Sequence, residues 1–279
     1  MNADPTLSAY LQHWGARAVP FSQAAGEPLF RSPLIDQALD LLQQSAALRS
    51  VMVLSGVNGV GKSALIAHWA RRLEPKLFQP VVITHATLSG LGLLCTVLAK
   101  LGQTPKSRRH QNLLLLEEAL QRLDRLTPVL ILDEAHVYRP GVLDEVRLLL
   151  GLNLPRQPLF ALILAGDPYF LDSLRLQSQR ALYSRISAAL ALAPLDRPMV
   201  ADYLTQALSH VGIERPCFEP ATIDLLAAAS EGLPRLLNHL ARAAWIEAGR
   251  SRSTTITPHH LQPALALVPA VKDKISSHS

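Results

Sequence analysis

The chain has 279 residues, of which 49% are hydrophobic and 18% are charged. This composition excludes a disordered or low-complexity chain, and the length is enough to bury a substantial core. The 27 basic and 22 acidic side chains leave a formal net charge of +5, which suits a polyanionic partner without requiring one. Two cysteines, Cys95 and Cys217, are too few for a disulfide framework or a zinc site, which favours a reducing compartment.

The sequence contains no recognisable membrane segment or secretory leader. Its first residues, MNADPTLSAYLQHWG, lack the basic start and apolar block of a signal peptide. Residues 77–99 contain no charged side chain, but their polar residues and two glycines make them too polar for a span of about 20 apolar residues. We therefore expect a cytoplasmic protein with no membrane partner.

Short apolar runs alternate with longer helical patterns through the first two thirds of the chain. Five runs are strand candidates: 51–55, 81–84, 128–133, 159–166 and 187–193. Each is mostly apolar throughout rather than alternating, which is typical of central strands in a covered parallel sheet. Helical patterns lie between them at 62–73, 89–101, 111–126 and 142–152. This alternation predicts an α/β fold with a parallel sheet.

The pattern changes near residues 194–197, beyond which no strand pattern appears. Helical segments follow at 197–211, 220–230, 233–248 and 258–267, and the front of the chain is helical around 7–14 and 34–47. We therefore predict four parts: an N-terminal helical segment at 1–50 leading into an α/β core at 51–195, a helical domain at 196–268 and a flexible tail at 269–279.

A glycine-rich loop follows the first predicted strand and precedes a helix. It has the phosphate-loop pattern GxxxxGKS in the residues Gly56, Val57, Asn58, Gly59, Val60, Gly61, Lys62 and Ser63. Glycines let successive backbone amides point at phosphate oxygens, and the helix N-terminus adds its dipole. Lys62 would reach the β- and γ-phosphates and Ser63 would ligate Mg²⁺, so ATP with Mg²⁺ is the expected ligand. The flanking strand and helix favour this interpretation over a glycine-rich turn without a ligand.

An apolar strand candidate later in the chain ends in two acids, Asp133 and Glu134. Asp133 is placed to hold Mg²⁺ through its water shell, and Glu134 to polarise the attacking water. Two solvated acids at a strand end are the simpler interpretation of this segment alone. The phosphate loop earlier in the chain favours the catalytic interpretation, and the second acid argues against a small-molecule kinase.

Three arginines are candidates for sensing or stabilising phosphate charge. Arg180 and Arg185 precede the fifth strand candidate and could reach across a subunit interface to the γ-phosphate of a neighbour. For Arg180, a solvated basic helix is an equally good interpretation. Arg235 lies on the first turn of a helix in the run GLPR and could couple the position of the helical domain to the phosphate state.

These runs resemble the AAA+ ATPases, through GVNGVGKS, LILDEA, the two arginines before the fifth strand, and GLPRLLNHL. Within that family the chain is similar to the ExeA-like group, which includes TniB- and MuB-like transposition ATPases. The marks of that group are LFRSPLIDQAL, LDEVRLLLGL, LILAGDPYF and SRI. The likeness covers about residues 17–268 and implies an AAA+ P-loop NTPase with a five-stranded parallel sheet and a C-terminal helical lid.

The resemblance also implies roles for individual residues. It implies ATP binding at residues 56–63, Mg²⁺ at Ser63 and Asp133, and a catalytic base at Glu134. It further implies an arginine finger at Arg185 or Arg180 and a nucleotide sensor at Arg235. One departure is Asp167, which stands where relatives usually place a neutral polar residue. An acid there predicts slow hydrolysis or a switch-like role.

A cluster of cations predicts a contact with nucleic acid. Lys106, Arg108 and Arg109 lie in the polar stretch 103–110 between two apolar helices. Three cations on an exposed loop suit contact with a phosphate backbone, which is independent of sequence and sensitive to salt. No aromatic residue is interleaved, so base stacking is not indicated. The alternative interpretation is a solvated charge run.

Three hypotheses of function follow. The first is an ATPase that forms a ring or helical filament on double-stranded DNA and recruits or activates a transposase. The second is a secretion-associated ATPase of the ExeA type, whose members usually continue into a membrane segment and a wall-binding domain. Because this chain ends after the helical lid, we expect the first rather than the second. The third is a nucleotide-dependent scaffold with little turnover, which Asp167 would favour.

Overall fold

The computed structural model describes residues 5–22, 28–84, 89–123, 125–153 and 157–267. The chain divides into two compact units. The sheet unit consists of Pro33–Asn58 and Lys62–Leu192, and the helical unit consists of Met1–Ser32, Gly59–Gly61 and Ala193–Ser279. The predicted tail at 269–279 lies outside the described residues.

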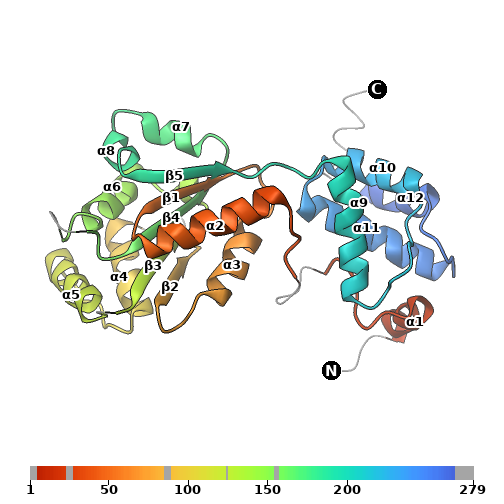
Figure 1. Ribbon diagram of the computed structural model, residues 1–279, viewed down its shortest axis with the longest axis horizontal. Coiled ribbons are helices and arrows are strands. Elements are labelled where there is room, and N and C mark those ends of the chain that lie inside the picture. Colours follow the sequence, from red (N-terminus) through yellow and green to blue (C-terminus); the bar gives the residue numbers. More distant parts are fainter. Residues whose placement is uncertain (1–4, 23–27, 85–88, 124, 154–156, 268–279) are drawn as a thin grey trace. The chain divides into compact units, whose positions relative to one another are not determined.

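Five parallel strands form one sheet in the order β2-β3-β4-β1-β5 (Figure 1). Their bounds are β1 (Val51–Ser55), β2 (Phe78–Ile83), β3 (Thr127–Leu132), β4 (Ala161–Gly166) and β5 (Ile186–Ala191). The predicted fold class is therefore confirmed. β2 begins at Phe78, three residues before its predicted start at residue 81. Its Pro80 lies in an edge strand, where a missing backbone N–H is tolerated.

The central strands β3, β4 and β1 are buried on both faces, which explains their continuous apolar runs, whereas the edge strand β5 alternates partly buried and exposed residues. Val53 and Leu132 pack into an apolar cluster with residues of the helices α4 (Gly90–Lys100), α5 (Arg109–Arg122) and α6 (Pro140–Leu149). Met52 and Ile131, whose side chains alternate with these, are fully buried as well. The helix α2 (Pro33–Ala47) contacts β1, β3, β4 and β5 and crosses the sheet in Figure 1.

The sheet unit also contains elements that the sequence did not predict. They are the 3₁₀ turn η1 (Ala135–Val137) and the short helices α7 (Phe170–Arg175) and α8 (Arg180–Tyr183). Helices of 6 and 4 residues are too short to display an apolar period, which is why the pattern missed them. The helix α3 (Lys62–Arg72) begins at the end of the phosphate loop, as predicted.

The helical unit contains α1 (Pro5–Trp14), α9 (Arg197–His210), α10 (Pro220–Ser230), α11 (Pro234–Arg250) and α12 (Pro258–Leu267). The indole of Trp14 stacks on that of Trp245 with ring centroids 6.0 Å apart. Gly249 makes this approach possible, because a Cβ there would lie 3.0 Å from Trp14 Nε1.

The prediction of one segment at 1–50 leading into the α/β core differs from the structure. Residues up to Ser32 group with the C-terminal helices, and only α2 groups with the sheet.

Parallel strands bring the predicted site residues to one edge of the sheet. β3, β4 and β1 are neighbours, with Ser55 of β1 paired to Gly166 of β4 and Leu132 of β3 paired to Leu164 of β4. The phosphate loop, Asp167 and Asp133 each follow one of these strands directly. This carboxyl edge is where ligands bind in open α/β sheets. No helix among the described residues is long and apolar enough to cross a membrane.

Candidate functional site

The phosphate loop connects β1 to α3. Gly59 and Gly61 have φ angles of 88° and 109°, a backbone region that residues with a Cβ rarely adopt. A Cβ at Gly61 would meet no atom within 4 Å, so the backbone conformation and not the available space requires glycine there. The glycines of the pattern therefore shape the strong curvature that a phosphate-binding loop needs.

Lys62 places a positive charge inside this loop. It is the first residue of α3 and only 4% exposed. Its Nζ donates hydrogen bonds to the carbonyl oxygens of Gly56 at 2.7 Å and Val57 at 3.3 Å. These bonds fold the side chain back over the loop. Ser63, the other predicted ligand residue, is exposed on the same first turn.

The acidic pair follows β3 and places its two carboxylates in different environments. Asp133 is 8% exposed, and its Oδ1 accepts the backbone N–H of Glu134 at 3.0 Å. Glu134 adopts a left-handed conformation with φ 53° and ψ 40°, which is strained for a residue with a Cβ. Its side chain is 41% exposed and lies 3.7 Å from Nε2 of His136. One carboxylate is thus sheltered and the other open to solvent, and their metal and water roles stay predictions.

Tyr138 is a neighbour of this pair that the sequence pattern did not single out. Its side chain is buried, and among the described residues its hydroxyl has no hydrogen-bond partner. Burial raises the pKa of Tyr138 to about 12, and the negative charge of Asp133 contributes to that rise. A neutral hydroxyl is therefore held next to a carboxylate.

The residues present fit a magnesium ion that is bound together with phosphates. Within the described part of the chain, no cluster of three or more His, Cys, Asp or Glu side chains could hold a metal ion alone. Mg²⁺ in nucleotide sites takes one or two protein ligands and completes its shell with phosphates and water. The Ser63 hydroxyl and the sheltered Asp133 carboxylate supply such a minimal set. When bound, the ion would neutralise charge on the transferred phosphoryl group.

Asp167 takes part in the turn that follows β4. Its Oδ1 accepts the backbone N–H of Tyr169 at 3.1 Å, and its carbonyl oxygen accepts the backbone N–H of Phe170 at 3.2 Å. A side-chain oxygen bonded to the N–H two residues further on is an Asx turn. The acid thus has a local structural role, and its effect on hydrolysis stays a prediction.

The structure distinguishes the two candidate finger arginines. Arg185 lies just after α8, is partly buried, and donates from Nη1 to the carbonyl oxygen of Ala181 in that helix. Arg180 is the first residue of α8 and is exposed. Both precede β5, as the sequence predicted. Which of them reaches a neighbour stays open.

Arg235 lies next to Gly59, one of the three phosphate-loop residues (59–61) that group with the helical unit. Its backbone N–H donates to the carbonyl oxygen of Gly59 at 3.2 Å. The turn before it accepts only glycine, because a Cβ at Gly232 would lie 1.9 Å from the carbonyl oxygen of Leu195. The predicted sensor arginine is therefore the second residue of α11, which follows a turn fixed by tight packing.

The basic stretch 103–110 differs from the prediction at its last two residues. α5 begins at Arg109, so Arg109 and His110 are helical and not part of a loop. The guanidinium of Arg109 forms an ion pair with the buried carboxylate of Glu145, with Nη2 and Oε2 2.8 Å apart. This pair offsets its charge, because the two groups are in direct contact. Lys106 and Arg108 are exposed in the loop itself, as predicted.

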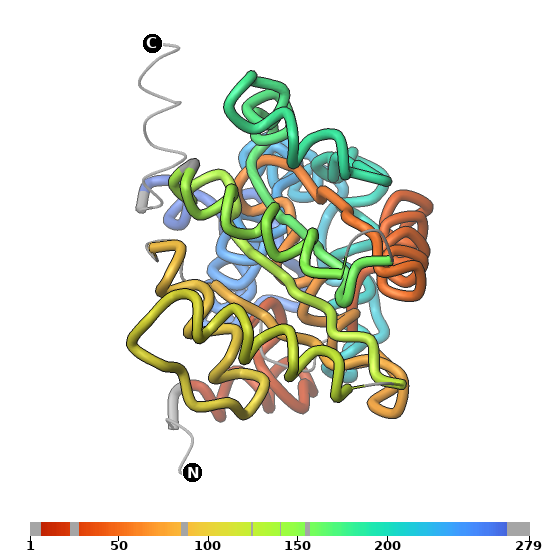
Figure 2. The backbone as a smooth tube through the Cα atoms, turned by 90° about the vertical axis from the view of Figure 1, so that its left-hand side faces the viewer, coloured from red at the N-terminus to blue at the C-terminus, as the bar shows by residue number. Residues whose placement is uncertain are grey.

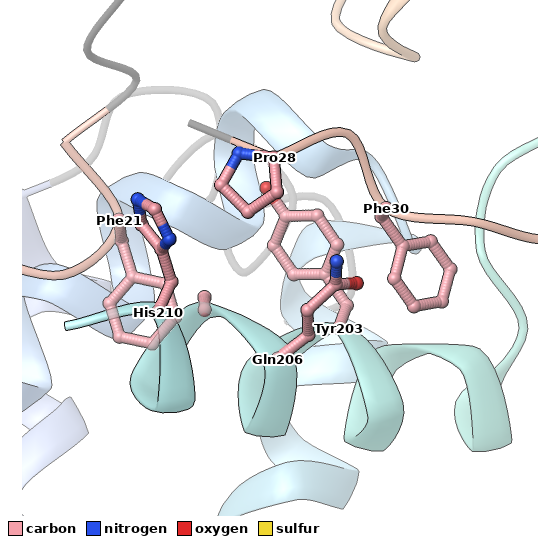
Figure 3. Close-up of a pocket in the computed structure, with 7 residues that line it drawn as sticks. Phe21, Pro28, Phe30, Tyr203, Gln206 and His210 are labelled. Carbon is pink, nitrogen blue, oxygen red and sulfur yellow. The ribbon is translucent and has the colours of Figure 1, made fainter. Parts of the chain in front are cut away.

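A small pocket in the helical unit was also missed by the sequence interpretation. It is lined by Phe21, Pro28, Phe30, Tyr203, Gln206, Ala207 and His210 (Figure 3). The rings of Phe30 and Tyr203 meet edge to face with centroids 5.5 Å apart. The hydroxyl of Tyr203 donates to Oδ1 of Asn238 at 2.9 Å.

The fold and the carboxyl-edge site agree with the class of protein that the sequence motifs predict. A five-stranded parallel sheet carries a GxxxxGKS loop after β1 and an acidic pair after β3, and a helical segment follows at the C-terminus. These are the features of AAA+ P-loop NTPases. Residues 46–174 match the family model described as an AAA domain. The domain match also agrees with the predicted class of enzyme, an AAA+ ATPase.

One curated relative and several solved structures are similar to the chain. General secretion pathway protein A of Aeromonas hydrophila is 33% identical over 146 residues, which are 52% of this chain and 27% of that protein. The chain therefore matches about a quarter of that relative's length. This similarity agrees with the ExeA-like side of the predicted resemblance, whereas the transposition subgroup stays a prediction.

The solved structures are similar in fold. Cdc6p of Pyrobaculum aerophilum has a TM-score of 0.69 at 19% identity, covering 88% of this chain and 69% of that one. The ORC1 protein of Aeropyrum pernix in complex with DNA has a TM-score of 0.67 at 20% identity, covering 95% and 70%. The RuvB Holliday junction branch migration motor of Thermotoga maritima has a TM-score of 0.58 at 18% identity, covering 85% and 70%.

Proposed function

We propose that this chain binds ATP with Mg²⁺ and hydrolyses it at the carboxyl edge of the sheet. The observation that carries the proposal is the placement of the curved glycine loop with the buried Lys62 after β1 and of the split acidic pair after β3, two strands that flank β4 in the sheet. Lys62 would bind the β- and γ-phosphates. Glu134, exposed to solvent, would accept a proton from the attacking water.

The Glu134→Gln variant tests this assignment. It keeps the size and the polar contacts of the side chain but cannot act as a base. We expect ATP affinity close to that of the wild type and phosphate release reduced by roughly 10²–10⁴-fold. Asp144→Asn, which changes an exposed carboxylate on α6, is the matched control. Wild-type turnover in Glu134→Gln would remove the catalytic role.

We further propose that ATP promotes a homo-oligomer, a ring or a helical filament, in which Arg185 or Arg180 completes a neighbour's site. An arginine that stabilises transition-state charge in other NTPases is worth roughly 10³–10⁵ in rate. Sedimentation with ATP and duplex DNA should show that the wild type assembles. Of the single variants Arg185→Ala and Arg180→Ala, the one that removes the finger should still assemble but hydrolyse ATP poorly. A chain that stays monomeric under those conditions would contradict the proposal.

The finer proposal is an ATPase that assembles on double-stranded DNA in the cytoplasm and recruits or activates a transposase. It is supported by the exposed cations Lys106 and Arg108, and by the resemblance to transposition ATPases in the sequence motifs. The similar ORC1 structure was solved in complex with DNA, which makes a DNA-associated role for this fold worth testing.

A second candidate is a secretion-associated ATPase, favoured by the 33% identity to general secretion pathway protein A. A third is a scaffold with little turnover, favoured by Asp167. The rate of ATP hydrolysis with and without duplex DNA separates the three. Stimulation by DNA supports the transposition hypothesis, turnover unaffected by DNA supports the secretion hypothesis, and binding without turnover supports the scaffold.

A further inference from the structure

The basic loop, residues 103–108, joins α4 to α5 and is shaped by hydrogen bonds at both of its ends. Figure 2 shows the two helices, drawn in yellow tones, side by side. At the entry, the backbone N–H of Gln103 donates to the carbonyl oxygen of Leu98 at 2.9 Å, and that of Gly102 to Ala99 at 3.0 Å. With Gly102 at φ 75°, this is a Schellman motif that fixes the direction in which the chain leaves α4.

Within the loop, one buried side chain binds the backbone on both sides of a single residue. Asn112 of α5 is fully buried. Its Oδ1 accepts the backbone N–H of Lys106 at 2.6 Å, and its Nδ2 donates to the carbonyl oxygen of Lys106 at 2.8 Å and to Sγ of Cys95 at 3.5 Å. The amide thus pairs with Lys106 as a neighbouring strand would, although no strand is present.

The far end of the loop is held by an ion pair with a buried member. Nε and Nη2 of Arg109 donate to the carboxylate of Glu145 on α6 at 2.8–3.1 Å. Glu145 also packs against the start of α4, where a Cβ at Gly90 would lie 3.5 Å from its Oε2. A bidentate arginine pair of this kind fixes orientation as well as distance. Arg109 therefore acts as a support for the loop.

The groups that remain exposed are of one sign. Lys106 and Arg108 lie on the loop, and Lys100 precedes it, all three exposed. No acidic residue occurs between positions 100 and 116 of the sequence. Such a set suits a regular row of negative charges, which the backbone of duplex DNA provides about every 1.7 Å along its axis.

We propose that Asn112 is a positioning residue for DNA binding, which holds the basic loop in the shape in which Lys106 and Arg108 meet neighbouring phosphates. The inference rests on the proposed DNA binding and adds how the interface is built. Because the clamp orders the backbone of Lys106 during folding, that ordering does not have to occur on binding. Lys106 and Arg108 supply the charge, and Asn112 supplies the shape.

Charge and shape predict different responses to salt. The double variant Lys106→Ala/Arg108→Ala removes two cations per subunit, so the log–log dependence of affinity on salt should flatten by up to about 1.8 per bound loop. Asn112→Ala keeps both cations. Its affinity for an unrelated duplex should fall by about tenfold at every salt concentration, with the slope unchanged.

Two further variants keep the test interpretable. Asn238→Ala also removes a buried asparagine, from α11, and should bind DNA as the wild type does if loss of a buried amide alone has no effect. If Asn112→Ala does not fold, as shown by circular dichroism, Asn112→Leu replaces it. It keeps the branched shape of the side chain and adds no charge but loses both hydrogen bonds to Lys106, and it should lower affinity in the same parallel manner.

The outcomes separate the clamp from the DNA interface itself. A parallel loss of affinity in the Asn112 variant, with a flattened slope in the double variant, supports the proposal. Wild-type DNA affinity in the Asn112 variant, or a flattened dependence of its affinity on salt, overturns the positioning role of Asn112 but leaves the proposed DNA binding in place. A wild-type protein that does not bind duplex DNA overturns both this inference and the proposed DNA function. An unchanged slope in the double variant moves the DNA surface elsewhere and likewise overturns the clamp's role.

Discussion

The phosphate loop and the basic loop are both suited to negative charge, yet they differ in one part of what shapes them. In the phosphate loop the supports are local, because Gly59 and Gly61 supply the backbone angles and Lys62 bonds to Gly56, six residues earlier. The basic loop has local supports as well, in Gly102 and in Asn112, six residues after Lys106, but it adds the pair Arg109–Glu145, which joins residues 36 positions apart. A loop with local supports and a known residue pattern can be recognised in a sequence, whereas a support from a distant side chain cannot.

The two loops also present their charge differently. Lys62 is buried, whereas Lys106 and Arg108 are exposed to solvent. Salt screens exposed charges within about 8 Å at physiological ionic strength and affects buried ones much less. Nucleotide binding should therefore depend on salt less steeply than DNA binding does.

The largest effect is expected for Lys62→Ala. The variant removes the buried ammonium group and its bonds to two loop carbonyls, so the phosphate contact and the loop shape are lost together. We expect a loss of ATP affinity of roughly 10²–10³-fold, measured by titration with a fluorescent nucleotide. Lys76→Ala, which removes an exposed lysine before β2, is the matched control. Affinity within threefold of the wild type in Lys62→Ala would contradict the role of the buried charge.

The second prediction compares equivalent substitutions in the two loops. Gly61 and Gly102 have φ angles of 109° and 75°, and a Cβ at either would meet no atom within 4 Å. Alanine at each position should therefore cost a similar amount of stability, about 1–2 kcal/mol, through backbone strain alone. Gly61→Ala should weaken ATP binding by about tenfold and leave DNA binding unchanged. Gly102→Ala should do the reverse, and equal effects of both variants on both ligands would erase the distinction between the loops.

The same distinction explains how much of the structure the sequence predicts. The strands and most helices were predictable because apolar runs and the pattern GxxxxGKS are local signals. The place of α1 was not, because it depends on the stacking of Trp14 on Trp245, which are far apart in the chain. Arg109 was assigned to the loop for the same reason, since its partner Glu145 lies on another helix. The acidic pair was predicted, but the buried hydroxyl of Tyr138 beside it carries no sequence signal.

The smallest effect is expected at Tyr138, beside the acidic pair. The surroundings of this residue differ from the basic loop in whether buried polar groups have hydrogen-bond partners. Asn112 and Glu145 have hydrogen-bond partners, whereas the hydroxyl of Tyr138 has none among the described residues. Tyr138→Phe should therefore raise the free energy of unfolding by about 1 kcal/mol at neutral pH, because it removes a buried hydroxyl that has no described partner in place of water. A further difference should emerge in alkali, since the folded protein raises the pKa of Tyr138 from 10.0 to about 12.

The sign of that difference follows from proton linkage. Between pH 10 and pH 12 the hydroxyl ionises in the unfolded chain but stays protonated in the folded one, so its contribution to stability is complete below pH 10 and is lost as the pH rises through this window. Urea unfolding at pH 9 and pH 11 should show that Tyr138→Phe loses about 1 kcal/mol less stability than the wild type over that interval. Tyr169→Phe is the matched control, because its hydroxyl belongs to a side chain that is 75% exposed and is reached by water in both states. If Tyr138→Phe and the wild type lose the same stability over this interval, the hydroxyl of Tyr138 is not sheltered beside Asp133. The buried polar groups near the acidic pair would then be as well paired as those of the basic loop.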